Sequence, residues 1–276
     1  MNSFILDPIL RRALEEDIGT GDVTTLATIE PGTQASAELV AKENFVLAGI
    51  DVARRVFQLL SAETAFEKLI TDGQTVKRGD VMAWIKGDAA ALLQGERVAL
   101  NLLQRMCGVA TLTAEFVRQV VGTQAVIVDT RKTTPGLRVL EKYSVRMGGG
   151  GNHRMALYDA VLIKENHVAA AGGITAAVGR AKLRVPHTQK IEVEVRNQDE
   201  VAEALAAGAD ILLLDNMTLT ELTAAVELVG DRAITEASGG VNLDTVREIA
   251  ETGVGLISVG ALTHSYRAVD ISMLFT

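Results

Sequence analysis

Residues 125–164 read AVIVDTRKTTPGLRVLEKYSVRMGGGGNHRMALYDAVLIK. This stretch opens and closes on short apolar runs, and a charged residue follows each run, Asp129 after the first and Lys164 after the second. Short, near-continuous apolar runs are typical of strands that are buried on both faces of a sheet. The stretch therefore predicts two buried strands, separated by a polar segment that is rich in cations and glycine.

The same pattern recurs toward the end of the chain. Four further apolar runs are followed by a polar residue or glycine: 191–193 before Glu194, 211–214 before Asp215, 233–234 before Glu236 and Ser238, and 256–259 before Gly260. Helical segments such as 199–207 and 243–252 lie between them. Strands that alternate with helices at about 20 to 34 residues per unit predict a parallel sheet and a β/α barrel. Because six strands are clear, we expect an incomplete barrel of six to seven strands.

The N-terminal part has a different organisation. Residues 4–17 have helical spacing, 35–40 and 45–48 resemble strands, 51–60 a helix, and 81–86 a strand between turns. A long helix then begins at Asp88. The sequence thus predicts an N-terminal α+β sandwich domain over 1–107 and a barrel domain over 108–266, with 267–276 as a segment that could rejoin the first domain.

Composition excludes several classes of function. The chain has 276 residues, a net charge of −8 and a pI near 5.1, which argues against nucleic acid as a partner. Cys107 is the single cysteine, so no internal disulfide can form. The start lacks a basic segment followed by an apolar one, and no apolar run approaches the roughly 18 residues of a membrane span. These features predict a cytoplasmic protein without a membrane partner.

The central stretch is basic although the chain as a whole is acidic. Seven cations and two acids between residues 131 and 164 give a charge of +5. Such a concentration favours an anionic small molecule as ligand. Arg138, Lys142 and Arg146 follow one another at intervals of four, so we interpret these three as a solvated helix face. The other cations stand beside turns or strand ends, where we expect them to bind ligand: Arg131, Lys132, Arg154 and Lys164, with His153 beside them.

In a β/α barrel the carboxyl ends of the strands meet at one mouth. Lys164, Glu194 and Asp215 should therefore converge there. Two carboxylates could hold Mg²⁺ together with water and phosphate oxygens. The glycine loops at Ser238–Gly240 and at Gly260 and Ala261 favour a phosphate site at helix N-termini, although plain tight turns are the alternative. Lys164 could instead form a Schiff base, as in barrel aldolases.

A set of motifs in this order carries a family resemblance: GERVALNLLQRMCGVAT, DTRKTTPG, GGGGNHR, LIKENH, IEVEV, LLLDN, EASGG and SVGALTHS. Together they resemble quinolinate phosphoribosyltransferase over essentially the whole chain. A related protein linked to molybdenum uptake shares much of the pattern and stays open as an alternative. The resemblance implies a homodimer with an N-terminal α/β sandwich and a C-terminal α/β barrel.

The activity implied is Mg²⁺-dependent transfer of phosphoribosyl from phosphoribosyl pyrophosphate to quinolinate, with loss of CO₂. By itself, Arg97 fits a surface arginine on an amphipathic helix, whereas the resemblance implies that it enters the partner's active site. The resemblance implies catalytic roles for Lys132, Glu194 and Asp215, with the two acids on the metal directly or through water. The substrate-binding residues it implies are Arg97, Arg131, Lys132, Thr133, His153, Arg154, Lys164, Glu194, Asp215, Ser238, Gly239, Gly240, Gly260 and Ala261.

Overall fold

The computed structural model describes residues 1–276, and the chain divides into two compact units. The first unit consists of Met1–Leu112, Thr134–Gly149 and Tyr266–Thr276, and the second of Thr113–Thr133 and Gly150–Ser265. The long helix α4 (Ala89–Gln119) begins in the first unit and ends in the second. Each unit is described by itself.

The first unit is built on a four-stranded antiparallel sheet with the strand order β12-β1-β5-β3. Its strands are β1 (Gln34–Ala41), β3 (Ala65–Lys68), β5 (Val81–Asp88) and β12 (Ile271–Phe275). Two short strands, β2 (Phe45–Val46) and β4 (Thr75–Val76), pair separately. The helices are α1 (Ser3–Ile18), α2 (Val23–Thr28), α3 (Ile50–Leu60) and the start of α4.

Alternation along the strands explains where the core of this unit lies. Leu39 and Ile85 are buried, whereas Trp84 between its buried neighbours in β5 is half exposed. In a strand, successive side chains point to opposite faces, so one face of the sheet packs inward. Phe57 of α3 and Leu103 of α4 belong to the same buried cluster. The predicted N-terminal α+β sandwich is confirmed.

Helix α5 (Arg138–Met147) belongs to the first unit, whereas the sequence-based boundary assigned it to the barrel domain. The reason is its buried Leu140, which is part of the apolar cluster of the first unit. The interpretation of Arg138, Lys142 and Arg146 as one solvated face is wrong for its central member. Arg146 is exposed and Arg138 half-buried, but Lys142 is only 1% exposed.

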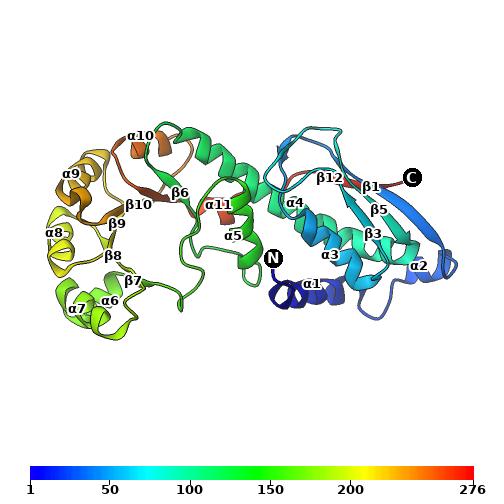
Figure 1. Ribbon diagram of the computed structural model, residues 1–276, viewed down its shortest axis with the longest axis horizontal. Coiled ribbons are helices and arrows are strands. Elements are labelled where there is room, and N and C mark those ends of the chain that lie inside the picture. Colours follow the sequence, from blue (N-terminus) through cyan, green and yellow to red (C-terminus); the bar gives the residue numbers. More distant parts are fainter. The chain divides into compact units, whose positions relative to one another are not determined.

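The second unit is a six-stranded parallel sheet with the order β6-β11-β10-β9-β8-β7. Its strands are β6 (Val126–Val128), β7 (Val161–Ile163), β8 (Ile191–Val195), β9 (Ile211–Asp215), β10 (Ile234–Ser238) and β11 (Leu256–Ser258). The sheet is curved, and β6 and β7 form its two edges (Figure 1). The predicted incomplete α/β barrel with six strands is confirmed.

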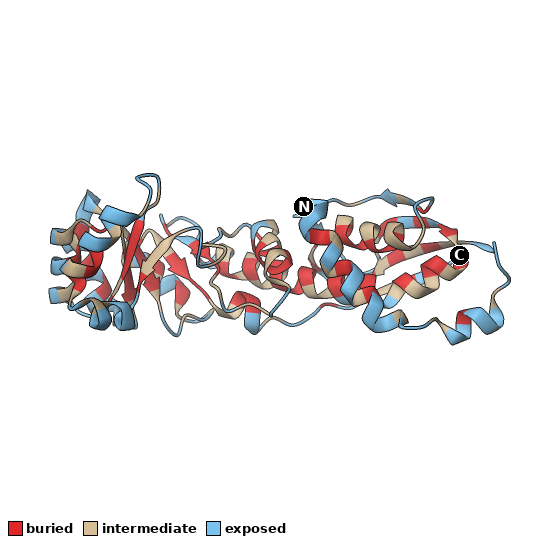
Figure 2. Cartoon of the chain, turned by 90° about the horizontal axis from the view of Figure 1, so that it is seen from below, coloured by how far each residue is buried: buried red, intermediate tan, exposed pale blue.

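Helices cover the outer side of this curved sheet (Figure 1). They are α6 (Glu165–Ala171), α7 (Ile174–Arg184), α8 (Gln198–Ala207), α9 (Leu219–Val229) and α10 (Val246–Glu251); a 3₁₀ turn, η1 (Gly230–Arg232), and the short α11 (Ala261–His264) complete the unit. Figure 2 shows buried residues along the strands and exposed ones on the outer helices. No helix has both the length and the apolar character needed to cross a membrane.

Candidate active site

A cavity of about 540 Å³ in the second unit lies at the carboxyl ends of the strands. Parallel pairing explains this position, because it brings the ends of neighbouring strands to the same edge. Ser238 of β10 is in register with Asp215 of β9, for example. Twelve of the fourteen predicted residues line the cavity: Arg131, Lys132, His153, Arg154, Lys164, Glu194, Asp215, Ser238, Gly239, Gly240, Gly260 and Ala261.

The two remaining predicted residues do not line the cavity. Thr133 follows Lys132 directly but is not in the cavity wall. Arg97 is exposed on α4 in the first unit.

Four side chains in the cavity wall are cationic: Arg131, Lys132, Arg154 and Lys164. Arg154 is held by its own loop, because one terminal nitrogen donates to the carbonyl oxygen of Ala160 at 3.0 Å. Its Nε is buried without a hydrogen-bond partner. Burial, and next the charge of Arg131, lower the pKa of Arg154. Cations that are partly desolvated and close to one another favour an anionic ligand between them.

The main chain around Lys132 is fixed from two sides. Its N–H donates to Oγ1 of Thr130 at 3.0 Å, and its carbonyl oxygen accepts from Oγ1 of Thr263 at 2.8 Å. Thr263 lies on α11, directly after the last strand of the sheet. The loop after β6 and the helix after β11 are therefore joined beside the cavity.

Lys164 directly follows the last residue of β7. His167, three residues later, stabilises the turn that begins at Lys164. Nδ1 of His167 accepts a hydrogen bond from the main-chain N–H of Lys164 at 2.9 Å. The Lys164 ammonium lies 3.6 Å from a carboxylate oxygen of Glu194, and the lysine side chain is 51% exposed. The hydrogen bond between the first and last residues of KENH explains why a histidine stands three residues after the lysine.

Glu194 and Asp215 approach the cavity from the neighbouring strands β8 and β9. Directly after Asp215 the chain turns through Asn216, whose φ of 55° is the only positive φ of a non-glycine residue. The side-chain amide of Asn216 donates to Oδ2 of Asp215 at 2.9 Å. Its main-chain N–H donates to the carbonyl oxygen of Ser238 at 2.9 Å. These bonds connect the two strand ends that carry Asp215 and Ser238.

The two glycine loops line the cavity, but the helix that we expected directly after Ser238–Gly240 begins later. Asn242 forms a turn by accepting from the N–H groups of Asp244 and Thr245, and α10 starts only at Val246. Helix α11 has a single turn. Exposed loop N–H groups, rather than a long helix dipole, are therefore the feature that suits a phosphate here.

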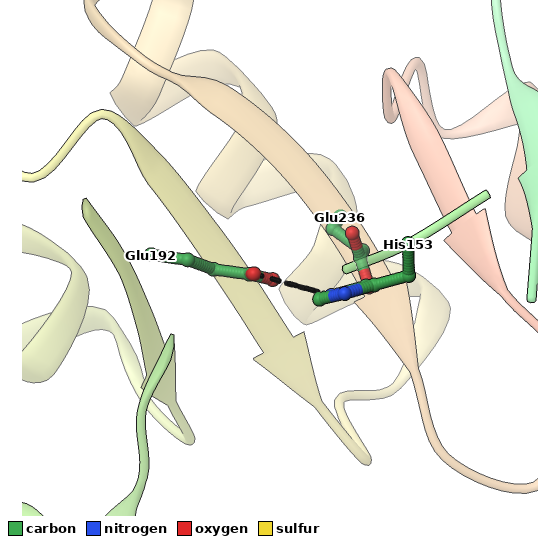
Figure 3. A group of neighbouring side chains, drawn as sticks. All are labelled: His153, Glu192 and Glu236. Carbon is green, nitrogen blue, oxygen red and sulfur yellow. Dashed lines mark hydrogen bonds and ion pairs between the residues drawn. The ribbon is translucent and has the colours of Figure 1, made fainter. Parts of the chain in front are cut away.

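Two buried acids, Glu192 and Glu236, form a cluster with His153 behind the cations. Nε2 of His153 is 3.1 Å from Oε2 of Glu192 and 3.6 Å from Oε1 of Glu236 (Figure 3). Both glutamates are less than 5% exposed. Burial, and next the charge of Glu192, raise the pKa of Glu236 to about 7, while His153 and Ser258 oppose that shift.

Seven residues in the cavity wall were not among the predicted site residues: Thr130, Leu162, Leu213, Glu236, Val241, Ser258 and His264. Glu192 lies behind the wall and was also missed. The alternating sequence IEVEV contained a signal for it, because residues two apart in a strand point to the same face. Glu192 therefore shares the face of Glu194, deeper in the barrel.

Two family models match the chain. The model described as "Quinolinate phosphoribosyl transferase, N-terminal domain" matches residues 22–107, and the one described as "Quinolinate phosphoribosyl transferase, C-terminal domain" matches residues 109–274. Together they cover almost all of both units.

Individual proteins agree with these matches. The chain is 45% identical over 274 residues to the probable nicotinate-nucleotide pyrophosphorylase [carboxylating] of Bacillus subtilis, with 99% of this chain and 94% of that protein covered. It is 42% identical to the chloroplastic enzyme of that name from Arabidopsis thaliana, with 98% and 83% covered. The solved structure of the nicotinate-nucleotide pyrophosphorylase from Francisella tularensis superimposes with a TM-score of 0.95 at 38% identity, covering 100% of this chain and 98% of that one.

Proposed function

The chain belongs to the quinolinate phosphoribosyltransferase family, and from this premise we propose how its cavity acts. The enzyme transfers phosphoribosyl from phosphoribosyl pyrophosphate to quinolinate with decarboxylation. The products are nicotinate mononucleotide, pyrophosphate and CO₂, in de novo NAD biosynthesis. The observation that carries the assignment is the full-length similarity of this chain to carboxylating pyrophosphorylases.

The charge of the cavity suits these two substrates. Quinolinate carries adjacent carboxylates, and Arg131, Arg154 and Lys164 offer cations to them. Arginine can bind a carboxylate through two parallel N–H groups, and Nε of Arg154 lacks a protein acceptor. Lys132 and the loops at Ser238–Gly240 and at Gly260 would bind the phosphates of the second substrate.

Glu194 and Asp215 would bind Mg²⁺, directly or through water. Both are oxygen donors on neighbouring strands at an open cavity, which fits a hard cation that keeps part of its hydration shell. When bound, Mg²⁺ supplies positive charge to the pyrophosphate leaving group. The cavity wall contains no cysteine, and neither acid belongs to a group of three or more possible ligands with a histidine, so the donor set does not resemble a zinc site.

The chemical step requires charge stabilisation more than a nucleophile from the protein. The ring nitrogen of quinolinate displaces pyrophosphate at the anomeric carbon, where positive charge develops. A carboxylate, Asp215 or Glu194, stabilises that charge, while Lys132 stabilises the departing pyrophosphate. Departure of CO₂ leaves an electron pair on the ring carbon, which the adjacent positive pyridinium nitrogen stabilises, and a proton from water then completes the C–H bond of the product, so no further cofactor is needed.

A Schiff-base mechanism at Lys164 fits the geometry less well. A lysine nucleophile must be neutral, which is usually achieved by burial or by a second cation. The side chain of Lys164 is half exposed and lies next to a carboxylate, that of Glu194, so neither condition is met by this contact.

We propose further that the enzyme is a homodimer in which Arg97 enters the site of the partner subunit. The support is that Arg97 is exposed on α4 and does not line the cavity of its own second unit. A cytoplasmic location stays a prediction.

The deciding experiment is turnover by purified protein. With quinolinate, phosphoribosyl pyrophosphate and Mg²⁺, we expect nicotinate mononucleotide and CO₂ in equal amounts. Absence of both products would reject the assignment in favour of the relative linked to molybdenum uptake or of a non-catalytic phosphate-binding protein. Borohydride trapping of a substrate on Lys164 would support the aldolase alternative.

A further inference from the structure

The buried cluster behind the cavity contains two acids for which the proposed reaction has no use. Glu192 of β8 and Glu236 of β10 both point toward the His153 ring (Figure 3). Nε2 of His153 is 3.1 Å and 3.4 Å from the two carboxylate oxygens of Glu192. The nearer oxygen of Glu236 lies at 3.6 Å. One ring nitrogen therefore faces two buried carboxyl groups.

The other ring nitrogen determines where the proton of His153 lies. Nδ1 accepts the main-chain N–H of Arg154 at 2.7 Å. A nitrogen that accepts cannot carry a proton, so the neutral ring has its N–H at Nε2. That N–H then donates toward Glu192, which leaves the ring with a partner at both nitrogens.

The same ring holds the main-chain N–H of Arg154. The main-chain N–H of His153 donates to Oδ1 of Asp129 at 2.9 Å, which ties the segment to the end of β6. Arg154 is thus held at its main-chain nitrogen by the ring and at its guanidinium by Ala160. Its buried Nε lacks a protein partner. The acids on β8 and β10 and the main-chain N–H of Arg154 therefore contact the same ring through its two different nitrogens.

A buried metal ion is the competing interpretation, because one ligand atom from each of His153, Glu192 and Glu236 lies within 4.8 Å of the others. Ligation by Nε2 would move the ring proton to Nδ1. That proton would then meet the N–H of Arg154 head-on, and the 2.7 Å hydrogen bond would be lost. Hydrogen bonding explains both ring nitrogens, whereas metal binding explains only one.

We propose that Glu192 and Glu236 are positioning residues that act on Arg154 through the Nε2–H tautomer of His153, and so set the affinity for the dicarboxylate substrate. The inference rests on the proposed function only in taking Arg154 as a ligand for a substrate carboxylate. Glu192 makes the shorter contact and should have the larger effect.

The first test does not depend on activity. Nitrogen-15 NMR of histidine-labelled protein reports the tautomer of each ring, and the signal of His153 is the one missing from a His153→Gln variant. We expect the Nε2–H tautomer in the unliganded protein at neutral pH. A ring protonated at Nδ1 would overturn the inference. So would Mn²⁺ that broadens this signal at one ion per chain and no longer does so in Glu192→Ala.

The second test measures substrate affinity. Glu192→Ala leaves a buried N–H without an acceptor, so the KM for quinolinate should rise about tenfold while the KM for phosphoribosyl pyrophosphate changes less than about twofold. Glu192→Gln keeps an oxygen acceptor and should restore most of the affinity, which a purely electrostatic role would not do. Glu227→Gln, an exposed substitution on α9, is the matched control.

The two tests separate the possible failures. If the wild-type protein neither binds nor converts quinolinate, the proposed function fails, and the tautomer measurement still decides whether the hydrogen-bonded arrangement exists. If Glu192→Ala folds and its KM for quinolinate equals that of the wild type, the positioning role is refuted although the activity stands. If Glu192→Ala does not fold, Glu192→Gln decides: the inference requires it to keep the Nε2–H signal and most of the affinity.

Discussion

Gly239 and Asn216 are packed so closely that a Cβ at Gly239 would overlap the Asn216 side-chain amide. Gly239 also has a φ of 103°, which other residues rarely adopt. We expect Gly239→Ala to lose about 2 kcal/mol of stability and to displace Asn216, and with it Asp215. The KM for phosphoribosyl pyrophosphate should rise at least tenfold. Gly240→Ala is the matched control, because its φ is also positive but open space surrounds it. Equal effects of the two variants would contradict this explanation.

His167 should contribute to catalytic efficiency although it does not line the cavity. Replacing it with alanine removes the acceptor for the main-chain N–H of Lys164. Because one hydrogen bond is worth about 1 kcal/mol, we expect kcat/KM for quinolinate to fall about fivefold. Steady-state kinetics at saturating phosphoribosyl pyrophosphate measure this. Asn166→Ala, an exposed change on the same helix, should leave the value unaltered.

The stability of the protein should depend on pH through Glu236. Burial and the charges of Glu192 and Asp129 raise its pKa to about 7 from 4.5 in the unfolded chain, against the opposing effects of His153 and Ser258. Between these values the folded state holds a proton that the unfolded chain has released. The stability contributed by this group is therefore complete below pH 4.5 and is lost as the pH rises through 7.

Glu236→Gln removes that dependence. Relative to the wild type, the variant should gain stability between pH 5 and pH 8, by at most about 3 kcal/mol. Urea denaturation of both proteins at the two pH values gives the difference. A difference in unfolding free energy that is the same at pH 5 and pH 8 would show that Glu236 ionises normally.

Glu141 should be important for folding, because it is only 1% exposed and accepts from three groups. Nε and one terminal nitrogen of Arg105 donate to its Oε1, and the N–H of Thr134 donates to its Oε2. Glu141→Gln leaves the arginine without a counter-charge and should cost about 3 kcal/mol. Thermal unfolding measures this loss. Glu63→Gln, in an exposed turn of the same unit, should change the melting temperature by no more than about 1 °C.

Arg97 and Lys164 should belong to active sites that two chains share. Each of Arg97→Ala and Lys164→Ala should lose at least 100-fold in kcat/KM, a typical result of removing one preorganised charge. If sites are shared, unfolding and refolding the two variants together should restore up to about a quarter of wild-type activity per chain, because half of the chains then form mixed dimers with one intact site. Mixed dimers isolated with two different tags but without activity would exclude a shared site.

The sequence predicts the second unit well because its strands are short and most of their residues are apolar. Three of the apolar runs are followed by Lys164, Glu194 or Asp215, charged residues that cannot enter the core. The same residues therefore mark where each strand ends and at which end of the barrel the cavity lies. The cations of the cavity could be predicted for the same reason. Glu192 and Glu236 could not, because a carboxylate inside a strand is stable only if the fold supplies a partner, and His153 comes from a distant loop.

Helix α5 shows a second kind of limit. Its basic residues at intervals of four look like a solvent-facing side, and nothing local indicates that Lys142 is buried. Which unit a helix packs against is determined by complementary apolar surfaces, here around Leu140. The identity of the family, by contrast, depended on complete motifs rather than on periodicity.

Strand β12 pairs with β1, with Leu39 opposite Met273, although almost the entire chain separates them. During synthesis, β1 can pair with β5 early, but its other edge has no partner until residues 271–275 leave the ribosome. An unpaired edge of that kind attracts other strands. The nascent protein must therefore pass through a period in which the barrel can already be complete while one edge of β1 is still unpaired. At that stage, chaperone binding or aggregation should be most sensitive to changes in β1 and β12.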